Sequence, residues 1–182
     1  MLKYVDVRPE HQRQLNESKE IIRGRLKSAG KLPRDLLDRL DGYLDTNEQA
    51  SVVELYVDAA KTQAHWGEVH GFCIYLQPRT FDIWEKTGKP RLTAVLFHEL
   101  VHVAGGSELD AEVFENLLFM KGEGASPPTV ADWKEFETNK GKGLWLSLSL
   151  DTGIVTDKSQ LKLCRIEHGP TDEDSSVIRL GW

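Results

Sequence analysis

Two histidines and a glutamate lie close together in the middle of the chain, in the run His98-Glu99-Leu100-Val101-His102. On an α-helix, residues four positions apart share one face and lie about 6 Å apart along the axis. Two imidazoles placed in this way can both bind one zinc ion, at roughly 2.0–2.1 Å. Glu99 is one residue further round the helix, where its carboxylate can reach a metal-bound water without binding the metal. The run predicts a zinc site with His98 and His102 as ligands and Glu99 as the general base.

The residues around this run predict the helix that the spacing requires. Pro90 suits the first helical turn, and Gly105-Gly106 supplies a residue that tolerates the left-handed conformation that ends a helix. Between them, apolar residues recur at helical spacing, which predicts one buried face: Leu92, Val95, Leu96, Leu100 and Val103. The alternative is a core helix with two incidental histidines and no metal.

A third protein ligand must come from elsewhere, because catalytic zinc sites use three protein ligands and a water. A second helix is predicted from Ser107 to about Lys121, with Ser107 as its N-cap and Asp110 completing a capping-box pattern. That role occupies Asp110, whereas Glu108 is at the first helical position and is free to point back toward the metal. Glu112 lies one turn further along, where it could instead hydrogen-bond a ligand histidine.

The region from residue 71 to residue 120 resembles the zincin metallopeptidases. The spacing is similar to the metzincin pattern H-E-x-x-H-x-x-G-x-x-H, with Gly105 at the glycine and Glu108 in the place of the third ligand. It also resembles short intracellular gluzincins, whose ligand glutamate opens an E-x-x-A-(D/N) signature on the next helix, here Glu108-Leu109-Asp110-Ala111-Glu112. Both comparisons select Glu108, and they leave the subfamily open. The resemblance implies a zinc metallopeptidase (a hydrolase acting on a peptide or protein substrate) with an α+β fold: a single zincin-like domain with a small, mostly antiparallel sheet and an active-site helix.

A second hypothesis is that the chain binds zinc but does not catalyse a reaction. A small domain of this kind could be a zinc-binding regulatory or protein-interaction module. A peptide-cleavage assay separates this hypothesis from the hydrolase.

Composition and charge narrow the class of protein. The 182 residues predict one domain spanning 1–182, and the apolar content of 40% with 29% charged residues is ordinary for a soluble chain. A formal net charge of −6 with no basic block argues against nucleic acid as a partner. No apolar run is long enough to span a membrane, and the N-terminus has no apolar signal core. Cys73 and Cys164 are expected to be free thiols, and the predicted compartment is the cytoplasm.

The other periodic segments predict the elements that surround the motif. The patterns indicate strands at 2–8, 71–77 and 144–150, a further strand within 160–166, helices at 9–29 and 33–44, and a loop at 122–128. Residues 51–60 fit strand and helix alternation almost equally and are assigned to a strand. In zincins a strand at the sheet edge precedes the active-site helix and pairs with substrate. Segment 71–77 occupies that place in the sequence, and an internal strand is the equally weighted alternative. Arg165 and His168 are the C-terminal candidates for stabilising a transition state.

Overall fold

The computed structural model describes residues 2–30, 32–45, 50–54, 67–78, 80–82, 91–120, 125–126, 145, 148–149, 152–153 and 163–164. The strands in these ranges are β1 Lys3–Val5, β2 Ser51–Glu54, β3 Gly67–His70, β4 Cys73–Leu76, β5 Ala125–Ser126 and β6 Leu163–Cys164. The helices are α1 Pro9–Lys27, α2 Arg34–Asp45, α4 Arg91–Val103 and α5 Glu108–Glu115, which continues as the π-helix Asn116–Met120. Segments 2–8, 9–29 and 33–44 therefore contain the elements that the sequence predicts.

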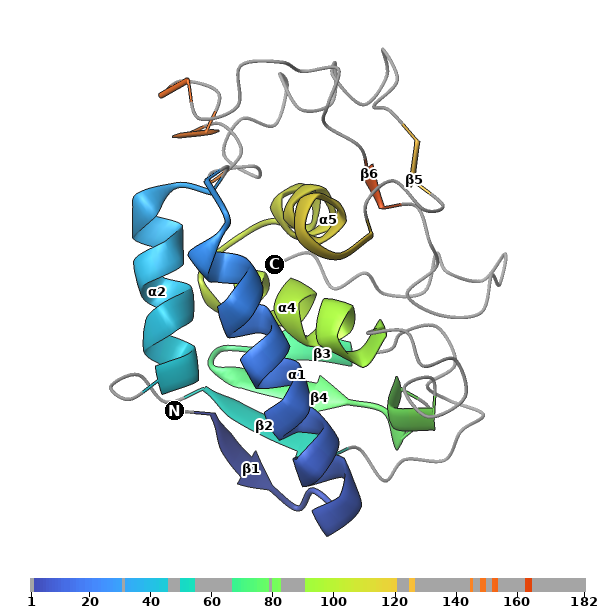
Figure 1. Cartoon of the computed structure of the whole chain (residues 1–182). Helices are drawn as coiled ribbons and strands as arrows, with labels where there is room; N and C mark the ends of the chain where they lie inside the picture. The colour runs from blue at the N-terminus through green and yellow to red at the C-terminus, as the bar shows by residue number, and fades with distance from the viewer. Residues whose placement is uncertain are drawn as a thin grey trace.

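The larger sheet corrects the expectation of a mostly antiparallel arrangement. Its strand order is β1-β2-β4-β3, and β1, β2 and β4 run parallel (Figure 1). Only β3 is antiparallel to its neighbour β4. The reason is the connections between the strands. Both α1 and α2 lie between β1 and β2 in the sequence, which is enough chain for a parallel crossover, whereas the tight turn at Gly71-Phe72 joins β3 and β4 as a hairpin.

The structure decides between the two alternatives for segment 71–77, an edge strand and an internal strand. Its strand, β4, pairs with β2 on one side and with β3 on the other, so it is internal. The burial of Ile74 and Leu76 agrees with a position inside the sheet. Within the described residues, β3 is the edge strand next to it. The hairpin places β3 outside β4 although β3 comes first in the chain.

Helices α1, α2 and α4 pack together and α4 lies against β3 and β4, with α5 packed on α4 (Figure 1). A single apolar core joins these helices to the sheet, because each contributes one apolar face. The largest side chains with no exposed surface in this core are Phe81, Phe97, Phe114, Leu15, Ile22, Leu36, Leu40, Leu44, Ile74, Leu76 and Leu92. Helix α4, which carries the motif, therefore packs against both the other helices and the sheet.

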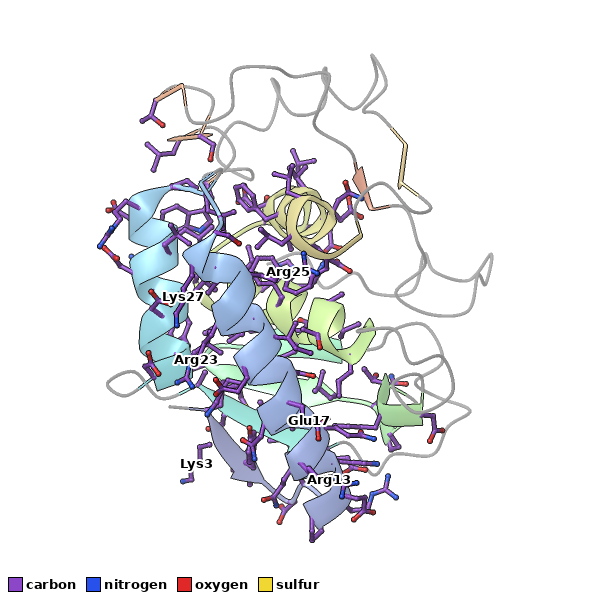
Figure 2. The ribbon with its side chains drawn as sticks, viewed as in Figure 1. Lys3, Arg13, Glu17, Arg23, Arg25 and Lys27 are labelled. Atoms are coloured by element: carbon purple, nitrogen blue, oxygen red, sulfur yellow. The ribbon has the colours of Figure 1, made fainter. Side chains whose placement is uncertain are left out.

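Polar contacts tie the first two helices to each other and to the sheet. Arg23 of α1 reaches toward α2 (Figure 2), where its guanidinium donates to the carbonyl of Leu44 (2.8 Å) and pairs with Asp45. At the other end of α1, the buried Glu54 at the end of β2 accepts from the Arg8 guanidinium at 2.6 and 2.8 Å. Burial alone would raise the pKa of Glu54, but the hydrogen bonds from Arg8 and the neighbouring His11 lower it below its ordinary value. The start of α1 is therefore held to the sheet by an ionised carboxylate.

Among the described residues after α5, β6 lies within the strand predicted at 160–166, whereas two other segments differ from the sequence-based prediction. Segment 144–150 was expected to be a strand, yet Trp145, Leu148 and Ser149, the residues described there, are helical. The hydroxyl of Ser149 donates to the carbonyl of Trp145, four residues back, as in a helix (3.0 Å). Residues 125–126 of the predicted loop form β5, which pairs with β6. In the part of the chain that the structure describes, no helix has the length and apolar character needed to cross a membrane.

Candidate functional site

Helix α4 carries the motif and is buried along most of its length. Leu92 to Val101 are all buried, so the helix passes through the core rather than along its surface. Within this run His98 is 3% exposed and Glu99 is 6% exposed. Polar side chains buried to this degree need partners or a function, because an uncompensated buried charge is strongly unfavourable.

The end of α4 confirms the predicted glycine stop and shows why two glycines are needed. Gly105 has φ +87°, the left-handed conformation that favours glycine. Its amide donates to the carbonyl of His102 (2.8 Å), and the amide of Gly106 donates to the carbonyl of Val101 (2.9 Å). A Cβ on Gly106 would lie 2.6 Å from Val101 Cγ1 and 2.8 Å from the Val101 carbonyl oxygen, so only glycine fits. This close reversal brings the chain back beside the two histidines.

Helix α5 starts immediately after the reversal, and its predicted cap is confirmed. The Ser107 hydroxyl accepts from the amide of Asp110 (3.2 Å), and the Asp110 carboxylate accepts from the amide of Ser107 (3.0 Å). Asp110 has no exposed surface and is occupied by this role. Glu108 is the first residue of α5 and is left to face α4.

The structure brings the three predicted ligands together. Nε2 of His98 and Nε2 of His102 are 3.1 Å apart. The carboxylate of Glu108 places one oxygen 3.5 Å from His98 Nε2 and the other 3.2 Å from His102 Nε2. One donor atom from each of the three residues lies within 4.8 Å of the other two. Among the described histidines, cysteines and acidic residues, these three form a group that could hold a metal ion.

These distances fit one bound metal ion. Two nitrogens bound to a tetrahedral zinc at about 2.05 Å are about 3.3 Å apart, close to the separation of the two Nε2 atoms. Two imidazoles and a carboxylate form a donor set that zinc hydrolases use, and it leaves one position for a water or a substrate. Both histidine side chains are under a tenth exposed, whereas that of Glu108 is 44% exposed. Solvent therefore reaches the group from the Glu108 side.

The remaining nitrogen of each histidine is fixed by a hydrogen bond. His98 Nδ1 lies 2.9 Å from Oε2 of Glu115, and His102 Nδ1 lies 3.0 Å from the carbonyl oxygen of Gly106. An ionised carboxylate and a carbonyl can only accept, so each Nδ1 carries a proton and donates. Both histidines therefore present Nε2, the nitrogen that faces Glu108, to the metal position.

The pKa values of His98 and Glu108 are shifted in opposite directions by their mutual contact. Burial alone would lower the pKa of His98, but hydrogen bonds with Glu108 and Glu115 raise it well above its ordinary value. Burial alone would raise the pKa of Glu108, but hydrogen bonds with His102 and His98 hold it well below its usual range. A metal ion would replace the proton on Nε2 of His98, which is the usual exchange when histidine binds a metal.

Glu99 has a different environment from the other acids. Burial is the main cause that raises its pKa from 4.5 to about 7, with the nearby His98 and His102 charges acting in the opposite direction. It lies outside the group of three donor residues. Glu99 is therefore a buried carboxyl next to the two histidines, with a pKa near neutral pH.

Sequence reasoning missed one residue of the site. It named Glu112 as the acid that could support a ligand histidine, whereas Glu115 has that contact. The signal that could have found it is spacing. Residues seven apart lie almost on the same face of a helix, so Glu115 faces α4 on the same side as Glu108. Arg165 and His168, the C-terminal candidates, lie outside the described residues.

No protein-family model matches the chain, and neither the curated proteins nor the solved structures compared with it gave a match. Function must therefore be inferred from the geometry and electrostatics of the site.

Proposed function

We propose that the chain is a zinc-dependent metallopeptidase of the zincin type, with His98, His102 and Glu108 as the metal ligands and Glu99 as the general base. The observation that carries the proposal is the convergence of both Nε2 atoms and the Glu108 carboxylate within 4.8 Å. The two histidines already have the tautomer that metal binding requires, because each Nδ1 donates to a fixed acceptor.

Zinc, when bound, supplies a Lewis acid that polarises a substrate carbonyl and makes a nucleophilic water available near neutral pH. The chain's own contribution is the handling of the proton. Glu99 takes the proton from the water as the water oxygen bonds to the carbonyl carbon. It then gives that proton to the amine nitrogen as the C–N bond breaks. The buried position of Glu99 next to the two ligand histidines supports this role, and in the metal-free protein it raises the pKa of Glu99 to about 7.

A peptide or protein is the proposed substrate. Strand β3 is the edge of the four-stranded sheet in the described residues, and α4 packs against it. An edge strand offers unpaired backbone groups to which an extended peptide can add by strand pairing. The expected substrate-binding strand is therefore β3 rather than β4. We also propose a cytoplasmic setting, which the free thiol of Cys73 supports.

The test combines metal content with cleavage of a diverse peptide library. The wild-type chain, loaded with zinc, should cleave peptides, and Glu99→Gln should keep the zinc while lowering turnover by at least about 10²-fold. Loss of zinc in the Gln variant would show that Glu99 is a ligand and that its assigned role is wrong. Zinc bound without any cleavage would favour the regulatory or interaction module over the hydrolase.

A further inference from the structure

Helix α5 contacts the ring of His98 at both of its nitrogens. Glu108 at the start of the helix lies 3.5 Å from Nε2, and Glu115 at its end lies 2.9 Å from Nδ1. Seven residues separate the two glutamates, which places both carboxylates on one face of α5 about two turns apart. The imidazole of His98 therefore lies between two acids from one helix.

The two histidines are supported in different ways. His102 Nδ1 donates to the carbonyl of Gly106, which belongs to the backbone and is fixed by the helix end itself. His98 Nδ1 donates to a side chain on another helix. The side chains of His98 and Glu115 are each 4% exposed, so water cannot readily replace the acceptor if that side chain is removed. At Nδ1, the orientation of His98 therefore depends on the side chain of Glu115, whereas that of His102 depends on the backbone.

We propose that Glu115 is a positioning residue of the metal site: it holds the Nδ1 proton of His98 and aims Nε2 at the metal. This inference rests on the proposed function. The carboxylate fixes the tautomer and the angle of the ring, and its negative charge increases the basicity of the nitrogen that binds the metal. One helix thus supplies a metal ligand at its start and the support for a second ligand at its end. Metal binding and the docking of α5 on α4 are consequently coupled.

The experiment measures zinc dissociation constants by competition with a chromophoric chelator, at neutral pH, for the full chain and three variants. Glu115→Ala removes the acceptor, and Glu115→Gln keeps an acceptor oxygen but removes the charge. Glu112→Gln is the matched control, because this half-buried glutamate lies on the same helix and outside the group of donor residues. Circular dichroism and urea unfolding establish that each variant is folded.

Glu115→Ala should weaken zinc binding by about 10–100-fold, the range for loss of a partner that orients a ligand. Glu115→Gln should fall between Ala and wild type, and Glu112→Gln should bind as wild type does. A second readout is the ¹⁵N spectrum of the histidine side chains in the zinc-loaded protein. The His98 Nδ1–H signal should have the chemical shift of a hydrogen-bonded proton in wild type and in Glu115→Gln, and it should lose that shift in Glu115→Ala, where the acceptor is gone. A purely structural role would lower the stability without changing this signal.

Two failures can be told apart. If wild type binds one zinc but neither Glu115 variant is weaker than Glu112→Gln, the positioning role is refuted and the proposed function stands. If wild type binds no zinc, the proposed function fails and this inference fails with it. Should Glu115→Ala not fold, the Gln variant decides, because it has nearly the same shape and must still be weaker than the control.

Discussion

Glu99→Gln should have opposite effects on activity and on stability. In the metal-free protein, burial raises the pKa of Glu99 from 4.5 to about 7. Below pH 4.5 the carboxyl is neutral in both the folded and the unfolded state. Between these two pH values the unfolded chain loses the proton while the folded chain keeps it, so the free energy of unfolding falls as the pH rises. Above about pH 7 the folded protein carries a buried negative charge, and the free energy of unfolding falls no further.

The magnitude follows from the difference between the two pKa values. A difference of this size corresponds to about 3 kcal/mol, as an upper bound, at about 1.4 kcal/mol for each pH unit. Glutamine has nearly the same shape and does not ionise. The Gln variant should therefore be more stable than wild type by less than about 1 kcal/mol at about pH 5 and by up to about 3 kcal/mol at about pH 8.

Urea unfolding in the presence of a metal chelator measures this difference, at about pH 5 and at about pH 8. The same variant, loaded with zinc, is assayed for peptide cleavage. If wild type and variant differ in stability by the same amount at both pH values, Glu99 is not a buried carboxyl with a raised pKa, and the physical basis of its role as a base is lost.

Three further predictions concern the rest of the site. Glu108→Ala should weaken zinc binding by more than about 100-fold, whereas Asp110→Ala should lower stability by about 1 kcal/mol through loss of the cap and keep its zinc; equal zinc affinities in the two variants would disprove the ligand assignment. Gly106→Ala should lower the free energy of unfolding in denaturant by about 1–3 kcal/mol, because its Cβ would overlap Val101. The control is Gly24→Ala, where no atom lies within 4 Å of the added Cβ, and it should be neutral or slightly stabilising. Zinc affinity should fall as the pH drops, by about tenfold per pH unit for each proton that zinc displaces, because the raised pKa of His98 makes protons compete strongly; affinity that is constant into the acid range would contradict a site built on histidine.

Local patterns in the sequence predicted the motif region well, because its structure is determined by near neighbours. The helix stop at Gly105 and the capping box of Ser107 and Asp110 are set within a few residues, and both are confirmed. The juxtaposition of Glu108 with the histidines follows from that stop and from the direction of the next helix. The contact of Glu115 with His98 was not predicted, because it depends on how α5 lies against α4.

The direction of the strands in the sheet and the structure around Trp145 were predicted less well, because they depend on contacts distant in the sequence, whereas β6 lies within the predicted strand at 160–166. Alternation indicates a strand but not the direction of its neighbour, and the parallel pairing of β1 with β2 is set by the helices between them. The run around Trp145 alternates like a strand. Trp145, Leu148 and Ser149 also match helical spacing, and the helix is the form in which Trp145 becomes buried.

The most direct test of the zinc assignment is the metal content of the chain. The full chain, purified without a histidine tag, should contain close to one zinc per molecule by elemental analysis, and a His98→Ala/His102→Ala double variant prepared in parallel should contain none. Wild-type protein without near-stoichiometric zinc, or a double variant that keeps it, would contradict the assignment of the metal to these histidines.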